Sequence, residues 1–168
     1  MSTYRVRPAA ETDIPEPAAM RGRLRDFLGE CDPDLWRLSN QQIAKMAEFC
    51  AENIGREDAR VFVAADAADR PVGMLMVRII ESAQITPQRF VRIDDAWVEP
   101  AHRRKGLMRR LVGHVARFAE QLGTEHALLD YAIRNPDSEE AWQSIGFRPS
   151  IIIAHTTTRE LLGSKPDA

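Results

Sequence analysis

Apolar residues in the first third of the chain recur mainly with a helical period. From Met20 to Leu28 they return every three or four positions, which is typical of a helix with one buried face, and the polar residues just upstream supply capping groups for its start. The same period predicts a second helix from Asn40 to Ile54, with Gly55 at its end. A short alternating stretch, Thr3–Arg7, predicts a strand ahead of both helices.

The pattern changes to β-branched and alternating in the middle of the chain. Arg60–Ala65 and Val72–Ile80 are separated by a polar turn and predict a hairpin. Phe90–Val98 predicts a third strand there, and it ends at Pro100.

Helical and strand periods alternate in the last third. The expected elements are a helix at Gly106–Leu122, a strand at Ala127–Ala132, a helix from Asn135 to Gly146, and final strands at Phe147 and Ile151–Thr157. Two successive strands joined through a helix require a crossover, so part of the sheet is expected to be parallel. The pattern therefore predicts a mixed sheet flanked by helices.

Length and composition fit a single globular domain, 1–168, with the residues after about 160 as a short tail. The chain has 168 residues, of which 44% are hydrophobic and 29% charged, too apolar for a disordered protein. A formal net charge of -2 argues against a nucleic-acid partner. Cys31 and Cys50 are far apart and lack zinc-ligand spacing, so neither a disulfide scaffold nor a metal site is expected. With no apolar leader or membrane-length stretch, the expectation is a cytoplasmic protein without membrane contact.

A basic loop, Arg103–Met108, follows the strand Phe90–Val98 and opens the helix expected at Gly106–Leu122. A helix start presents free backbone N–H groups and the positive end of the helix dipole, which suit a phosphate. Gly106 allows a ligand to approach the backbone closely. The sequence therefore predicts that this loop binds a pyrophosphate group. Neither the P-loop nor the Rossmann glycine pattern is present. The alternative is a basic loop that only caps a helix.

Two motifs in this region resemble those of the GNAT (GCN5-related N-acetyltransferase) superfamily. The stretch IDDAWVEPAHRRKGLMRRL is similar to the family's cofactor motif, with Arg103 and Gly106 at matching positions and Met108 where a small residue is usual. Asn135, followed by Gly146-Phe147, is similar to its second cofactor element. The resemblance is strong over Phe90–Phe147 and otherwise covers only the general layout.

The resemblance implies a fold, a co-substrate and a reaction. The fold is α/β (α+β), with a mixed, mostly antiparallel sheet of six to seven strands, a splayed parallel central pair and about four helices. Acetyl-CoA would donate its acyl group to an amine, which attacks directly in a ternary complex; no metal is implied, and a homodimer is compatible because dimers are common among such proteins. The residues implied in cofactor binding are Trp97, Val98, Arg103, Arg104, Lys105, Gly106, Leu107, Met108, Arg109, Asn135 and Trp142.

The catalytic candidates are Asp94, Asp95 and Tyr131. Strand alternation predicts that only one Asp faces the acceptor cleft, and Asp94 is the choice for general base or ammonium anchor, with Asp95 more structural. The alternative is that both acids are solvated or paired with an arginine, Arg78 or Arg92. Many GNAT members carry a Tyr where this chain has Trp142, whose indole is no practical acid, so Tyr131 is a substitute candidate for the acid. The alternative is that the thiolate leaves unprotonated.

Two further functions stay open on the sequence alone. One is a non-catalytic module that binds acyl-CoA and regulates a partner. Met108 and Trp142 favour it, because both depart from the family's usual residues. The other is a purely structural α/β domain, against which the two ordered motifs speak.

Overall fold

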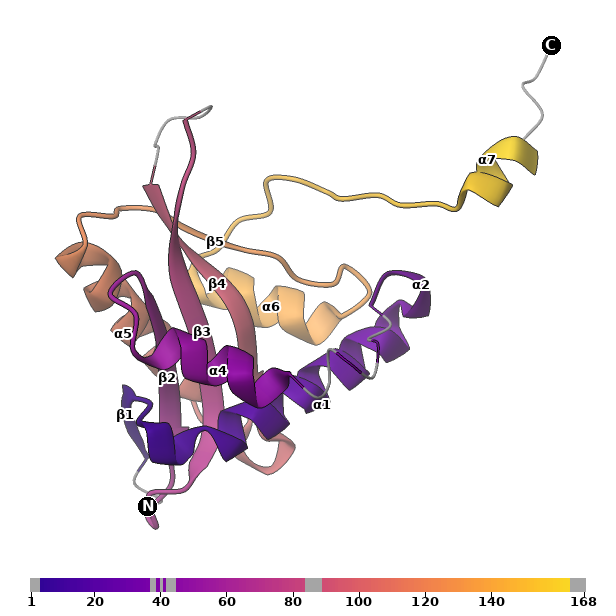
Figure 1. The fold of residues 1–168 in the computed structure, drawn as a ribbon. Coiled ribbons are helices and arrows are strands. Elements are labelled where there is room, and N and C mark those ends of the chain that lie inside the picture. Colours follow the sequence, from indigo (N-terminus) through magenta and orange to yellow (C-terminus); the bar gives the residue numbers. More distant parts are fainter. Residues whose placement is uncertain (1–3, 37–38, 40, 42–44, 84–88, 164–168) are drawn as a thin grey trace.

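The structure is a computed structural model that describes residues 4–36, 39, 41, 45–83 and 89–163. Five strands form one sheet in the order β1-β2-β3-β4-β5 (Figure 1). They are β1 (Arg5–Pro8), β2 (Ala59–Ala65), β3 (Pro71–Glu81), β4 (Arg89–Val98) and β5 (Ala127–Leu129). The first four pair antiparallel, while β4 and β5 pair parallel. The expected mixed sheet with a parallel pair is therefore confirmed.

The helices flank this sheet. They are α1 (Pro15–Cys31), α2 (Pro33–Trp36), α4 (Met46–Ile54), α5 (Leu107–Gln121), α6 (Pro136–Ile145) and α7 (Thr158–Gly163), with short 3-10 turns at Glu11–Asp13 and Pro100–His102. The long helices begin and end close to the predicted positions. The expected helix at Asn40–Ile54 is described only in part, because positions 40 and 42–44 lie outside the described residues.

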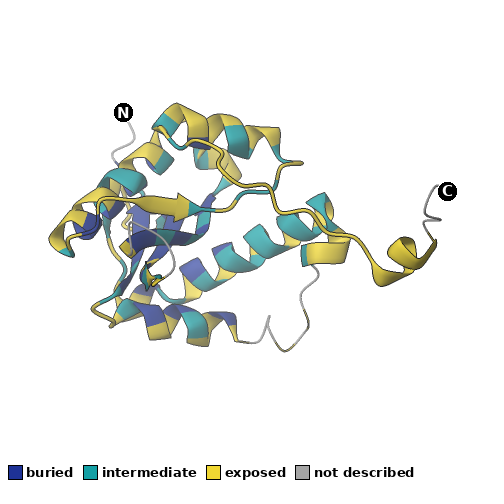
Figure 2. Ribbon diagram, turned by 90° about the horizontal axis from the view of Figure 1, so that it is seen from above, coloured by how far each residue is buried: buried dark blue, intermediate teal, exposed yellow. Residues whose placement is uncertain are grey.

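Helices cover both faces of the sheet, and the apolar faces of the helices decide which element lies where. Leu107, Leu111 and Val115 of α5 pack on one face in the largest buried cluster. Met20 of α1 and Cys50 of α4 pack on the other face in two smaller clusters. Seen from above, the buried strands lie between these helical layers (Figure 2). Because both faces are covered, β2 and β3 are buried along nearly their whole length.

The last predicted strands are wrong. The sheet has five strands within the described residues, not six or seven, and no strand forms at Phe147 or Ile151–Thr157. Residues 151–157 are extended but exposed, and they project away from the sheet toward α7 (Figure 1). The β-branched sequence favours an extended backbone, but a strand also needs a neighbouring strand for its hydrogen bonds, and no described strand pairs with these residues.

Candidate functional site

β4 and β5 separate along their length, as the sequence resemblance implied. Pairing joins Val91–Ile93 to Ala127–Leu129 and goes no further among the described residues. The second half of β4, residues 94–98, therefore has a backbone edge that no described strand covers on the β5 side. β5 itself ends at Leu129, three residues short of the predicted strand end.

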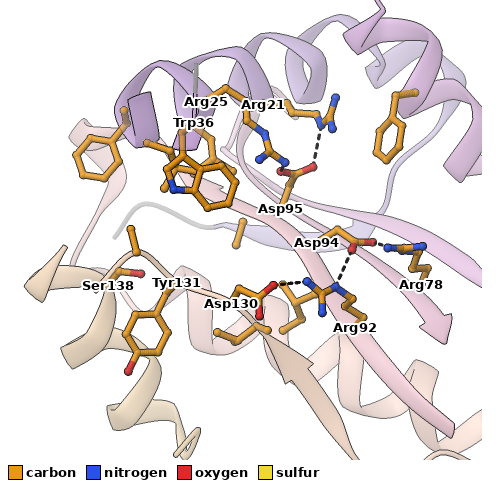
Figure 3. A pocket seen from close by; sticks show the side chains of 18 of the residues that line it. Arg21, Arg25, Trp36, Arg78, Arg92, Asp94, Asp95, Asp130, Tyr131 and Ser138 are labelled. Carbon is orange, nitrogen blue, oxygen red and sulfur yellow. Dashed lines mark hydrogen bonds and ion pairs between the residues drawn. The ribbon is translucent and has the colours of Figure 1, made fainter. Parts of the chain in front are cut away.

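A pocket of about 470 Å³ lies beside this separation, between α1, α4, β4 and the start of α6 (Figure 3). Its walls include Asp94, Asp95, Tyr131, Asn135 and Trp142. The structure thus brings together all three predicted catalytic candidates with two of the predicted cofactor residues. The remaining cofactor candidates lie outside its lining.

A β-bulge places both aspartates at this pocket. Met76 and Val77 of β3 are consecutive, yet they pair with Asp95 and Ile93, so Asp94 is an extra residue in β4. The bulge changes which face the later residues meet: Ile93 packs in the α5 cluster, whereas Asp95 bonds to α1. The prediction that only one aspartate faces the cleft is therefore wrong, because regular alternation does not hold at Asp94.

Asp95 is the more buried of the two, with a side chain 1% exposed. Arg21 Nε donates a hydrogen bond to its Oδ2 at 2.8 Å, and Arg25 Nη2 donates to Oδ1 at 2.5 Å. Both arginines come from α1, and their guanidinium groups also lie against aromatic rings, of Phe49 and Trp36 respectively. This arrangement ties α1 to the sheet at the pocket wall.

Asp94 is nearer to solvent and is held by arginines of the sheet. Arg78 Nε donates to its Oδ2 at 2.8 Å, and Arg92 lies 3.3 Å from its Oδ1. Arg92 also binds Asp130, so two carboxylates and two guanidinium groups form one network (Figure 3). The ion pairs that the sequence left open as an alternative are present. They do not remove Asp94 from the pocket wall.

Tyr131 follows β5 and borders the pocket from the opposite side (Figure 3). Desolvation raises its pKa above the usual 10, and the nearby charge of Glu139 raises the pKa further. The phenol therefore keeps its proton at neutral and mildly alkaline pH.

The basic loop leads directly into α5, whose N-terminus has no side-chain cap. Gly106 precedes the helix with φ 73°, and Arg104 has φ 58°, so the loop turns sharply at two left-handed residues. Leu107 is buried and Met108 packs partly against the core, so a ligand at the helix start meets mainly backbone N–H groups there. The first turn of α5 therefore presents backbone N–H groups without a side-chain cap, which suit an anion.

Several basic side chains of the loop also brace it. Arg103 Nε donates to the Val98 carbonyl at 3.0 Å, with its guanidinium over the Trp97 ring. Lys105 Nζ donates to the Ala101 carbonyl at 3.0 Å. Arg109 Nη2 likewise donates to a carbonyl of α6, that of Ser144. These contacts hold the helix start against the end of β4 and against α6.

The second predicted motif builds α6. Asn135 caps the helix by accepting a hydrogen bond from the Ser138 N–H at 3.2 Å. Trp142 is 7% exposed and packs edge-to-face on Phe147, at 5.4 Å between ring centroids. Both residues also border the pocket.

Sequence reasoning missed most of the charged pocket wall. Arg21, Arg25 and Trp36 come from α1 and α2, and Asp130 follows β5. Asp130 had a readable signal, since it ends an apolar strand, but the two arginines sit on a helix whose orientation the sequence does not show.

Two general features bear on what the chain can bind. Within the described ranges, no group of three or more His, Cys, Asp and Glu side chains is arranged to hold a metal ion. None of the helices in the described part of the chain is both long enough and apolar enough to cross a bilayer.

Comparison with known proteins agrees with the fold and the motifs. Streptothricin acetyltransferase of Streptomyces lavendulae is 36% identical over 90 residues, which cover 54% of this chain and 45% of that enzyme, so the match spans under half of the relative. A variant of the BH1408 protein of Bacillus halodurans has the same fold, with a TM-score of 0.80 at 18% identity over 91% of this chain and 98% of that one. The aminoglycoside N-acetyltransferase AAC(6')-Iy, in complex with CoA, gives 0.73 at 17% identity over 95% and 97%. The model of the acetyltransferase (GNAT) family matches residues 22–147. The chain therefore belongs to the GNAT acetyltransferase family.

Proposed function

We propose that this protein is an N-acetyltransferase that moves the acetyl group of acetyl-CoA to an amine. The observation that carries the proposal is the uncovered edge of β4 beside the uncapped start of α5, both next to a pocket walled by Asp94 and Asp95. An acyl carrier with a diphosphate and an amide-bearing arm needs these two backbone surfaces together.

The residues present fit such a co-substrate. The N–H groups at the start of α5 suit a diphosphate, and Arg104, exposed in the loop, adds charge. A Cβ at Gly106 would meet nothing within 4 Å, so the loop surface is open to a ligand. The edge of β4 that β5 leaves unpaired, residues 94–98, can pair with amide groups as an added strand would, and Arg103 already binds the Val98 carbonyl there. Bound there, acetyl-CoA supplies the activated thioester.

The pocket side chains would manage the protons of this transfer. The ammonium form of the acceptor, anchored by Asp94, first loses one proton, which Asp94 takes, directly or through water. The amine nitrogen then forms a bond to the acyl carbon while the carbon–sulfur bond breaks, and it loses a second proton, which balances the proton that the leaving sulfur gains. Tyr131, protonated at neutral pH, is the candidate donor to the leaving sulfur. Trp142 borders the same pocket, but its indole is no practical acid at neutral pH.

Charge in the pocket favours an acceptor that carries an acidic group besides its amine. Arg21 and Arg25 share the single carboxylate of Asp95, which leaves one positive charge unmatched on the α1 side among the residues that the structure describes. Glu52 also borders the pocket, but it is exposed and screened by water. Asp94 on the opposite side suits the amine. A guanidinium fork binds a carboxylate well, so amino acids and peptides fit this division.

A CoA-release assay tests both the proposed acetyl transfer and the proposed class of acceptor. The panel includes amino acids, peptides, polyamines and aminoglycosides, the last because relatives are named for antibiotic substrates. We expect turnover, and fastest turnover for amines bearing a carboxylate. Binding of CoA without turnover of any amine would contradict acetyl transfer and support the alternative, a non-catalytic acyl-CoA-binding module. Turnover restricted to polycations would contradict only the acceptor class.

Asp94→Asn tests the base assignment. We expect kcat to fall by roughly a hundredfold or more, because the amine then has no base to take its proton. Asp69→Asn is the matched control, because Asp69 also binds two arginines, Arg5 and Arg7, but lies outside the pocket lining. Full activity of Asp94→Asn across the pH range would overturn the assignment.

A further inference from the structure

Tyr4, the residue just before β1, contacts the segment around the basic loop although His102 lies 98 residues further along the chain. The Tyr4 hydroxyl lies 3.0 Å from His102 Nδ1, and Lys105 Nζ donates a hydrogen bond to the same hydroxyl at 3.2 Å. The Tyr4 backbone carbonyl accepts a hydrogen bond from Arg110 Nη2, near the start of α5, at 2.7 Å. Three side chains, from the turn before the loop, the loop itself and α5, thus converge on one residue.

The phenol ring of Tyr4 is fixed in the core. Tyr4 is 8% exposed and belongs to the largest buried cluster, together with Leu107 and Leu111 of α5. Its ring meets the His102 ring edge-on, at 5.7 Å between centroids, and the Lys105 ammonium lies 5.9 Å from its centroid. Because the ring is held on all sides, its hydroxyl can restrain loop side chains that are themselves more exposed.

Donors and acceptors at this hydroxyl fit together. An ammonium group only donates, so the phenol oxygen accepts from Lys105. The O–H of Tyr4 is then available to His102 Nδ1, which accepts it when the imidazole carries its proton on Nε2. Lys105 Nζ also donates to the Ala101 carbonyl at 3.0 Å, so its ammonium is engaged on the Tyr4 side of the loop.

The two side chains that the hydroxyl binds lie on either side of Arg104. Arg104 has φ 58°, a left-handed backbone that is unfavourable for a residue with a side chain. A loop of this shape needs restraint before and after the unfavourable residue. His102 supplies it on one side and Lys105 on the other, and both depend on the same hydroxyl.

We propose that Tyr4 is a positioning residue for acetyl-CoA, whose hydroxyl acts through His102 and Lys105 to hold the loop in the shape that receives the diphosphate. This inference rests on the proposed use of the loop by acetyl-CoA. It gives Lys105 the role of a brace instead of a direct phosphate ligand, because the phenol and a backbone carbonyl already engage its ammonium.

Calorimetric titration with CoA measures this positioning. Tyr4→Phe keeps the buried ring and removes only the hydroxyl, and we expect the Kd for CoA to rise about tenfold. Thr124→Val is the matched control, because it also removes one buried hydroxyl, which has no hydrogen-bond partner among the described residues. The control should bind CoA as the wild type does. An unchanged Kd for Tyr4→Phe would overturn the proposal.

Lys105→Met separates bracing from direct contact with phosphate, since Met keeps an apolar stem and loses the ammonium. If Lys105 acts through Tyr4, the double variant Tyr4→Phe/Lys105→Met should bind CoA within about twofold of the weaker single variant. The contrary result is that the two single losses multiply and that the loss for Lys105→Met shrinks at high salt. That result would make Lys105 a direct phosphate ligand and would overturn its role as a brace.

Limited trypsin digestion tests the brace without any cofactor. Trypsin cleaves after Arg and Lys, and mass spectrometry identifies the cuts after Arg103, Arg104 and Lys105. We expect these cuts to be about fivefold faster in Tyr4→Phe than in the wild type, because the loop opens locally, while cuts elsewhere keep their rate. Equal rates at the loop would overturn the proposal. If the wild type bound no CoA, the proposed function would fall, whereas the digestion would still show whether Tyr4 fastens the loop.

Discussion

Asp94 and Asp95 are neighbours along the chain but differ in their exposure to solvent and in the arginines that they bind. Asp95 is almost fully buried, with two guanidinium partners from α1, whereas Asp94 keeps contact with the open pocket and binds arginines of the sheet. The first arrangement stabilises the joint between α1 and β4. The second leaves a carboxylate where an ammonium group can reach it.

Asp95→Asn should destabilise the fold. Removing the charge leaves two largely buried guanidinium groups with a neutral partner, and we expect a loss of roughly 3 kcal/mol, the low end for breaking a buried pair. Urea unfolding measures the loss as a lower midpoint. Asp69→Asn, an exposed pair, should cost less than about 1 kcal/mol. A midpoint for Asp95→Asn equal to that of the wild type would contradict the structural role.

Tyr131→Phe tests the proton donor. Because desolvation and Glu139 raise the pKa of Tyr131 above 10, wild-type activity should not fall between pH 8 and 10 through loss of this proton, and it should fall only above that range. Removing the hydroxyl should lower kcat by roughly a hundredfold, with little change in KM. Equal kcat values for the two proteins would show that the sulfur leaves without help from Tyr131.

For single residues, the sequence predicted which side chains border the pocket better than which face of the sheet they lie on. Asp94, Asp95 and Tyr131 were all predicted, and all border the pocket. The faces of the aspartates were predicted wrongly, because the bulge at Asp94 depends on how β3 pairs with β4, which no local pattern records. Arg21 was missed for a related reason, since its partner is 74 residues away.

The start of α5 is the element whose backbone the proposed function uses most. Gly106→Ala places a side chain at φ 73°, which costs about 1–2 kcal/mol for a left-handed residue, and should also raise KM for acetyl-CoA. Gly113→Ala is the control within the same helix, where a Cβ meets nothing within 4 Å, and should stabilise by up to about 1 kcal/mol. Thermal unfolding and initial rates measure both. A KM raised equally by both variants would argue against a role of the loop backbone.

Helices and strands could be predicted where the residues that stabilise them are close in the sequence. The apolar spacing of α5 and the Asn135-Pro136 start of α6 depend only on neighbouring residues, and both helices form where expected. The hairpin β2–β3 needs only a short turn, and it too was predicted. The prediction of a strand at Ile151–Thr157 was wrong because the sequence pattern indicates which backbone conformation these residues prefer, but not which strand they would pair with.

At the scale of the whole molecule, the described residues leave two surfaces without a partner: the exposed apolar side chains within 148–163 and the outer edge of β5. If a second copy covers both, then folding and association are coupled, and the unfolding temperature depends on protein concentration by mass action. We expect the melting midpoint of the wild type to rise steadily as its concentration is raised a hundredfold, measured by circular dichroism in cells of different path length. Ile151→Asp/Ile153→Asp should melt at one temperature throughout, because those side chains touch nothing within their own chain's core. A wild-type midpoint independent of concentration would mean that the body from β1 to Phe147 carries the stability alone, and the exposed isoleucines would then need another explanation.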